Sequence, residues 1–205
     1  MTLIAVPPGL AFAEAEWTLA SPFQDNRSKW TGARRGAALP GAAHWTATLE
    51  ISGIRIGHAA AAPIRAFLAA LKGSANSFRV PAAINQHELS VAPTVKAGAL
   101  AGTINLTVQG LPASAQHLAA GYYMTVIRPN GVAQMLILTA PLIANGTGEA
   151  LASFEPPLIQ APAAGSPAET RSPFCEVTRV QSEASWKQAR NNAHSFRSID
   201  VEEVV

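Results

Sequence analysis

Only one stretch of the sequence, residues 62–81 (APIRAFLAALKGSANSFRVP), carries the pattern of an amphipathic helix. Its apolar residues recur at i, i+3, i+4 and i+7, so they line a single helical face. These residues are Ile64, Phe67, Leu68 and Leu71. Gly73 follows and predicts the end of the helix. We therefore expect one short covering α-helix, about 62–72, on a chain otherwise built from strands.

The clearest strand pattern is residues 44–56 (HWTATLEISGIRI), in which apolar and polar side chains alternate. This alternation predicts a half-buried strand with one wet face. Strand patterns also occur at 103–110, 121–141, 145–157, 174–180 and 194–204. Within 121–141, the turn formers Pro129, Asn130 and Gly131 predict a hairpin whose second arm lies in the middle of a sheet.

Short strands separated by turn signals are typical of a sandwich or barrel. The fold class that we predict is mainly β, a β-sandwich or barrel with one covering helix. A chain of 205 residues fits one such domain. We expect a single β-rich domain over 1–205, with an N-terminal extension at 1–15 and a Pro/Ala-rich loop or arm at 160–173.

Charged residues are scarce, at 14% of the chain against about a quarter in an average soluble domain. The formal net charge is only +2, so self-repulsion is weak. An uncharged surface of small residues favours association with other subunits. A simple bias of composition towards alanine is the alternative explanation.

The residues that usually carry catalysis or bind metals form no recognisable motif. Only two aspartates occur, Asp25 and Asp200, and the five histidines lack zinc-site spacing. Cys175 is the only cysteine, which excludes a disulfide framework within the chain. There is no nucleophile elbow, Walker A loop or dinucleotide fingerprint. We expect no catalytic, cofactor-binding or metal-binding residue and no enzymatic activity; a hydrolase with an unrecognised site stays an alternative.

Residues 27–35 (RSKWTGARR) form the one basic cluster. Cations interleaved with an aromatic residue can bind single-stranded nucleic acid by charge and stacking. The cluster consists of Arg27, Lys29, Arg34 and Arg35 around Trp30. Because no second basic stripe accompanies it, we favour a contact between subunits or a solvated loop over nucleic-acid binding.

The first residues, MTLIAVPPGLAFA, lack a basic region and are interrupted by Pro7, Pro8 and Gly9, so we expect no signal peptide. No apolar run approaches the roughly 18 residues that a membrane-spanning helix needs. We therefore expect no membrane partner.

The order of these segments resembles a family of tail proteins from tailed bacteriophages and prophages. EWTL and SPFQDNRSKW are followed by GAAHWTATLEI, by the helical stretch 62–81, and then by GTINLTVQGLP, LAAGYYMTVI and LILTAPLIANGTGEALASFEPPL. The resemblance covers most of residues 16–160 and is to the distal-tail or tail-tip class of siphophages.

This resemblance implies a non-enzymatic virion subunit with no catalytic residues. It implies a homo-oligomeric ring, a hexamer or trimer, that contacts the tail tube, hub and fibre proteins. The expected location is the virion tail, after assembly in the host cytoplasm. The alternative is a stand-alone β-sandwich module that binds carbohydrate or peptide.

Overall fold

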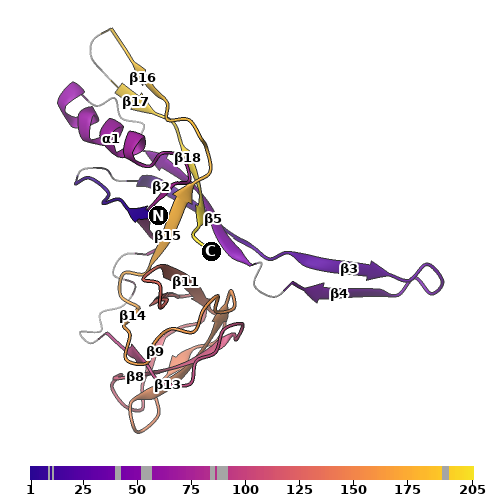
Figure 1. Cartoon of the computed structure of the whole chain (residues 1–205). Helices are drawn as coiled ribbons and strands as arrows, with labels where there is room; N and C mark the ends of the chain where they lie inside the picture. Colours follow the sequence, from indigo (N-terminus) through magenta and orange to yellow (C-terminus); the bar gives the residue numbers. More distant parts are fainter. Residues whose placement is uncertain are drawn as a thin grey trace. The chain divides into compact units, whose positions relative to one another are not determined.

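The computed structural model describes residues 1–8, 10, 12–39, 43–51, 57–83, 86, 92–190 and 194–205. Strands grouped into several sheets dominate this part of the chain, and it contains one α-helix (Figure 1). The predicted mainly β fold class with one helix is therefore confirmed.

The chain divides into two compact units, whereas the sequence predicts one domain. Unit 1 consists of Met1–Thr18, Trp45–Ala82 and Phe174–Val204. Unit 2 consists of Leu19–His44, Ala83–Pro173 and Val205. Each unit has its own six-stranded sheet.

The sheet of unit 1 gathers strands from both ends of the chain. Its strands, in spatial order, are β1 (Thr2–Leu3), β6 (Asn76–Pro81), β15 (Phe174–Arg179), β18 (Ile199–Glu203), β5 (His44–Ile51) and β2 (Phe12–Ala20). β1 runs parallel to β6, and β6, β15, β18 and β5 are mutually antiparallel where they pair. Residues 1–15 thus supply one edge strand of the sheet and the start of the other.

The predicted alternation holds along β5. Trp45, Ala47, Leu49 and Ile51 are buried, whereas Glu50 between them is exposed. The remaining residues of the predicted strand, 52–56, lie outside the described residues. One side of β5 therefore faces a core and the other faces solvent.

The helix α1 (His58–Ala70) begins earlier than the predicted 62–72 and ends slightly sooner. Residues 59–61 are alanines, which favour a helix but show no apolar periodicity, and the sequence pattern therefore missed this first turn. After the helix, Lys72 and Gly73 have positive φ values of 49° and 66°, which end it as predicted.

The apolar face of α1 is buried, as its spacing predicts. All four of the residues that define this face are buried: Ile64, Phe67, Leu68 and Leu71. The ring of Phe67 meets that of Phe78 in β6 edge-on, with centroids 5.3 Å apart. On the same sheet, Trp17 contacts Trp45 with ring centroids 6.3 Å apart. The predicted burial of the β5 side chains together with the helix is confirmed within unit 1.

The sheet of unit 2 is built mainly from consecutive antiparallel pairs. Its order is β14 (Ala168–Glu169), β10 (Tyr123–Ile127), β11 (Ala133–Leu138), β13 (Glu149–Glu155), β8 (Asn105–Gln109) and β7 (Thr94–Val95). β10 and β11 form the predicted hairpin, and β11 lies between β10 and β13, in the middle of the sheet as expected. A further pair, β9 (Gln116–Leu118) with β12 (Leu142–Ile143), belongs to the same unit.

Hydrogen bonds join the two edges of this sheet and close it into a barrel. The N–H of Ala168 donates to the carbonyl O of Pro93 (2.9 Å), and the N–H of Val95 donates to that of Ser166 (2.9 Å). The segment 160–173, which the sequence suggests is a loop or arm, is therefore partly a barrel edge.

The barrel is filled by apolar side chains. The larger members of this core are Leu106, Val108, Leu118, Met124, Leu136, Leu138, Leu142 and Phe154.

The chain turns before β13 at residues 145–148, as predicted. The side chain of Asn145 organises this turn because its Oδ1 accepts hydrogen bonds from the N–H groups of Thr147 (2.9 Å) and Glu149 (3.0 Å).

Two short two-stranded sheets complete the described structure. One pairs β3 (Phe23–Arg27) with β4 (Arg34–Ala38), and the other pairs β16 (Trp186–Gln188) with β17 (His194–Phe196). The single strand predicted over 194–204 is instead two strands, β17 and β18, because Arg197 and Ser198 interrupt the pairing.

Candidate functional site

Asp25 and Asp200, the only aspartates, lie on separate sheets of the described chain. Asp25 in β3 forms an ion pair with Arg34 (Oδ2–Nε 2.7 Å), and Asp200 in β18 accepts a hydrogen bond from Thr48 (Oγ1–Oδ1 2.9 Å). Among the described residues, no group of three or more His, Cys, Asp or Glu side chains could hold a metal ion. The absence of catalytic, cofactor and metal residues remains a prediction.

The histidines lie on different elements. His44 begins β5, His117 lies in β9, His58 begins α1, and His194 is buried at the start of β17. His87 lies outside the described residues. The histidines in the described part of the chain therefore come from four separate elements.

The basic cluster of the sequence is the end of a β-hairpin rather than an irregular loop. We call residues 23–38, which comprise β3, β4 and their turn, the basic hairpin. Its turn is held by Ser28, whose Oγ accepts hydrogen bonds from the N–H groups of Trp30 (3.3 Å) and Thr31 (3.2 Å). Gly32 has a φ of 69°, a conformation that suits glycine. These contacts give the cluster a defined backbone.

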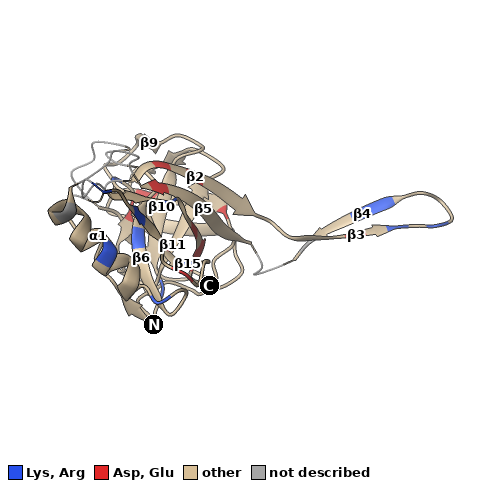
Figure 2. Cartoon of the chain, turned by 90° about the horizontal axis from the view of Figure 1, so that it is seen from above, with Lys and Arg blue, Asp and Glu red and all other residues tan. Residues whose placement is uncertain are grey.

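The cations of the basic hairpin crowd its turn end (Figure 2). Arg27 lies directly opposite Arg34 in the strand register, and Arg35 and Lys29 are close to them in the chain. Like charges at opposite positions destabilise a strand pair. Four cations accompany a single carboxylate, Asp25, so the hairpin carries an excess of positive charge.

The basic hairpin also exposes large apolar side chains. Trp30 at the turn is 97% exposed and Phe23 in β3 is 60% exposed. Every residue of β3 is exposed, as are residues 31–37. Exposed aromatic residues beside arginines are the composition that dominates binding energy at protein interfaces. These features identify the basic hairpin as a candidate contact surface.

A second candidate surface lies on the sheet of unit 1. The strand alternation places the exposed carboxylates of Glu50, Asp200 and Glu202 on the face opposite the buried side chains of β5 and β18. Glu16 of β2 borders the same shallow depression as Asp200 and Thr48. We call Glu16, Glu50, Asp200 and Glu202 the acidic face.

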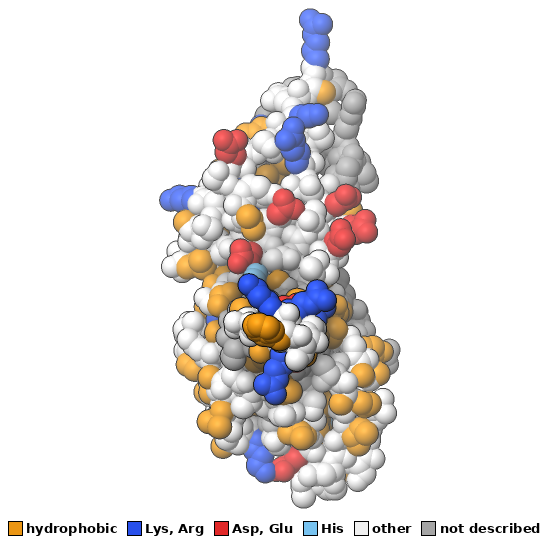
Figure 3. Space-filling view, turned by 90° about the vertical axis from the view of Figure 1, so that its right-hand side faces the viewer, with side chains coloured by type: hydrophobic (Ala, Val, Ile, Leu, Met, Phe, Trp, Pro, Cys, Tyr) orange, Lys and Arg blue, Asp and Glu red, His pale blue; other side chains and the backbone are white. Residues whose placement is uncertain are grey.

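The acidic face is formed by three neighbouring strands, β18, β5 and β2, and each of its four members is exposed. Figure 3 shows acidic side chains, in red, gathered on one surface of the molecule. Threonines 46 and 48 lie between them and present hydroxyl groups. The described part of the chain thus carries a cationic and an anionic surface, although the net charge of the whole sequence is small.

No protein-family model matches the chain, and no curated protein was found to be similar to it in sequence. Among the described residues, no helix combines the length and the apolar character that crossing a membrane would require.

Sequence reasoning missed both the acidic face and the hairpin geometry. The carboxylates of the acidic face come from strands as far apart as residues 16 and 202, so only the sheet order brings them together. The local signal was the pattern IDVEE at 199–203, in which two acidic residues alternate with buried ones. The β-hairpin was missed because residues 23–38 lack apolar alternation.

Proposed function

We propose that the protein is a non-enzymatic structural subunit that forms a ring at the tail tip of a tailed phage. In this role it joins the tail tube to the distal hub and fibre proteins, and it resides in the virion tail after assembly in the host cytoplasm. The observation that carries the proposal is the pair of oppositely charged exposed surfaces, the basic hairpin and the acidic face, on one chain.

Two different complementary surfaces on one subunit favour a head-to-tail contact. The basic hairpin of one subunit docks on the acidic face of the next, and repetition of this contact closes a ring if the rotation between subunits permits it. Such a contact should bury more than about 1,000 Å² of total surface. The low charge content elsewhere in the chain leaves little repulsion to oppose it.

The two kinds of side chain on the basic hairpin have different roles in this contact. The cations orient the approach and exclude wrong registers, since surface charges contribute more to association rate and specificity than to affinity. The ring of Trp30 and that of Phe23 supply apolar area, which is the main source of affinity. The mutual repulsion of Arg27 and Arg34 in the free subunit decreases when carboxylates of a neighbour approach.

A charge-swap experiment tests the contact. One variant carries three substitutions on the basic hairpin: Arg27→Glu, Lys29→Glu and Arg35→Glu. It leaves Arg34 unchanged, so the ion pair of Arg34 with Asp25 is kept. The other variant carries three substitutions on the acidic face: Glu16→Lys, Glu50→Lys and Glu202→Lys. It leaves Asp200 unchanged, because that carboxylate is hydrogen-bonded to Thr48. Sedimentation velocity at low ionic strength measures the association of each variant alone and of their equimolar mixture.

We expect each variant alone to associate less than the wild type, because its two surfaces then carry the same sign of charge. The mixture should recover association, since every contact in an alternating assembly again joins opposite charges. A matched control carries Lys187→Glu and Arg190→Glu, which are exposed cations outside both surfaces, and it should behave as the wild type. A mixture that associates no more than its components would refute the docking of hairpin on face.

A further inference from the structure

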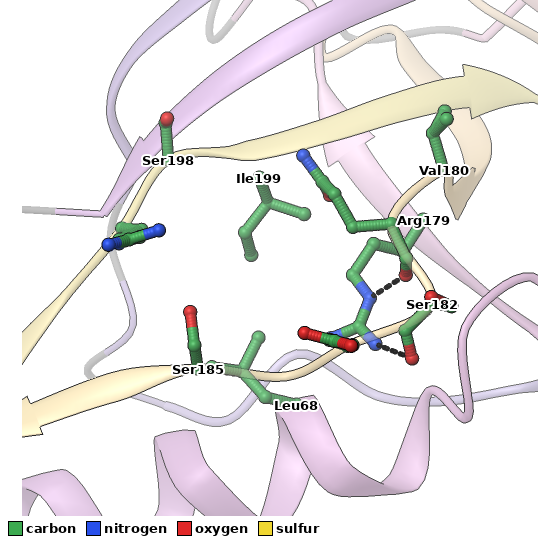
Figure 4. A pocket seen from close by; sticks show the side chains of 10 residues that line it. Leu68, Arg179, Val180, Ser182, Ser185, Ser198 and Ile199 are labelled. Carbon is green, nitrogen blue, oxygen red and sulfur yellow. Dashed lines mark hydrogen bonds between the residues drawn. The ribbon is translucent and has the colours of Figure 1, made fainter.

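The sheet of unit 1 contains a hollow beside its helix (Figure 4). It has a volume of about 620 Å³ and is lined by the end of β15, residues 180–183 and 185, residues 197–199 and one residue of α1. Leu68 and Ile199 form an apolar part of the wall, and the side chain of Arg179 lies on another side. All of the lining residues belong to unit 1.

Arg179 is a buried cation on the wall of this hollow. The residue is only 3% exposed, and its guanidinium donates hydrogen bonds to two backbone carbonyls: Nε to Gln181 O (2.8 Å) and Nη2 to Ser182 O (3.2 Å). The second terminal nitrogen, Nη1, makes no hydrogen bond to the described residues, and no described carboxylate pairs with the guanidinium. Burial lowers the pKa of Arg179 through desolvation of the charge.

A buried charge without a counter-ion is expensive, and carbonyl groups solvate it without neutralising it. No ion pair joins Arg179 to a carboxylate of the neighbouring strand β18 in the described residues, and Asp200 of that strand accepts hydrogen bonds from Thr48 and Gln181 instead. Arg179, which lines the hollow, therefore retains an unneutralised charge and one terminal nitrogen without a hydrogen bond to the described residues.

Several other polar groups line the same hollow. Ser182 and Ser185 are among its lining residues, and the hydroxyl group of Ser185 points into the hollow, whereas that of Ser198 points away from it (Figure 4). Both amide atoms of Gln181 are hydrogen-bonded to Asp200. Arg197 adds a second cation and Glu183 a carboxylate, so the wall carries a net single positive charge. A monoanion matches this balance better than a dianion such as hydrogen phosphate, which would meet the carboxylate of Glu183.

We propose that this hollow is a binding site for a carboxylate group, with Arg179 as the main ligand. A guanidinium presents its donors in a planar fork that fits a carboxylate. The hydroxyl group of Ser185 donates an additional hydrogen bond to the bound oxygens, and the apolar wall contacts the carbon chain that carries the carboxylate. The carboxylate belongs either to a small organic acid or to an acidic side chain of another protein.

The site is tested by NMR on the full-length protein, through the side-chain Nε–Hε signals of arginine. The signal of Arg179 is identified as the one that is missing in Arg179→Lys. Sodium acetate represents a free carboxylate, and the capped tripeptide acetyl-Ala-Glu-Ala-amide represents a protein side chain. The same capped tripeptide with Gln in place of Glu is the control for the peptide, and sodium chloride at equal ionic strength is the control for acetate.

We expect acetate and the Glu peptide to shift the Arg179 signal saturably, and the Gln peptide and chloride to leave it unchanged. Binding to the Arg179 variants is followed through the backbone amide signals of the lining residues Gln181, Ser182 and Glu183, which the variants keep. By this readout, Arg179→Gln should weaken binding by about tenfold or more, because a charge-assisted hydrogen bond is lost. The matched control Arg190→Gln, with the same change of charge on an exposed residue outside the hollow's lining, should bind as the wild type. Tighter binding of the Glu peptide than of acetate would assign the site to a protein partner.

If Arg179→Gln does not fold, Arg179→Lys takes its place, since it keeps the charge but loses the planar fork. It should bind acetate several-fold more weakly than the wild type. The inference is overturned if the Arg179 signal of the wild type does not respond saturably to either carboxylate. It is equally overturned if the Arg179 variants bind with unchanged affinity, because the arginine would then serve only to hold residues 181–182.

Discussion

The helix of unit 1 offers two neighbouring leucines whose truncation should have different effects. Leu68 and Leu71 both lie on the buried face of α1, with exposures of 3% and 0%. Leu68 borders the hollow beside the sheet, whereas Leu71 does not. Replacing either by Ala removes about three buried carbons, or roughly 2.4 kcal/mol of transfer free energy.

The difference between the two variants comes from the space that each leaves. The space left by Leu68→Ala opens into the existing hollow, which water can fill, so we expect a loss of about 2–3 kcal/mol. The space left by Leu71→Ala is enclosed, and the added cavity term should bring the loss to about 3–5 kcal/mol. The exposed substitution Ala69→Ser on the same helix is the control and should cost about 0.5 kcal/mol through helix propensity.

Urea unfolding followed by tryptophan fluorescence measures these losses in unit 1 alone. Trp17 and Trp45 form an edge-on pair within unit 1, and the segment 83–173 that builds the barrel contains no tryptophan. Trp30 is almost fully exposed and should change little on unfolding. If either leucine variant loses less than about 1 kcal/mol, the packing of α1 against the sheet is not as described. Equal losses for the two would refute the role of the hollow.

Three further outcomes are expected. An alanine forced to a positive φ costs roughly 1–2 kcal/mol. Gly148→Ala should destabilise unit 2 by more than this, because its Cβ would lie 2.4 Å from Leu111 O. Gly131→Ala, which has open space around its Cβ, should show only the smaller loss when thermal unfolding is followed by circular dichroism. Asn145→Ala should cost about 0.5–1.5 kcal/mol in the same assay, since exposed N–H groups of the turn lose their acceptor, and no measurable loss would mean that water replaces the side chain fully. Alanine at the four cations of the basic hairpin should leave DNA binding weak and unchanged in a filter or anisotropy assay; a steeply salt-dependent micromolar affinity that only the wild type shows would instead assign the hairpin to nucleic acid.

Local pattern was sufficient for most of the individual elements. The alternation around Trp45 and Leu49 predicts β5 correctly, and the spacing of Phe67 and Leu71 identifies the buried face of α1. The turn at Asn130 and Gly131 is likewise found, because turn geometry depends on neighbouring residues alone. These features are encoded within a few residues of each other.

What the sequence did not reveal depends on contacts between distant segments. The division into two units, the parallel pairing of β1 with β6 and the closure of the barrel each join segments far apart in the chain. The basic hairpin was missed because its strands bury nothing, so no alternation marks them. The burial of Arg179 could be inferred from the sequence, because the residue follows Cys175 and Val177 at alternate positions of β15 and so lies on the same buried face. A cation in such a position indicates either an interior partner or a ligand.

The central claim is that the chain forms a symmetric ring in a phage tail through contact of the basic hairpin with a neighbouring subunit. Cryo-electron microscopy of purified virions from a phage or induced prophage that encodes this sequence tests the claim most directly. The account predicts density for the protein at the tail tip with three-fold or six-fold symmetry, and with each basic hairpin seated on the acidic face of the next subunit. Absence of the protein from the virions, or its presence without a fixed symmetric position, would contradict the account and favour a stand-alone binding module.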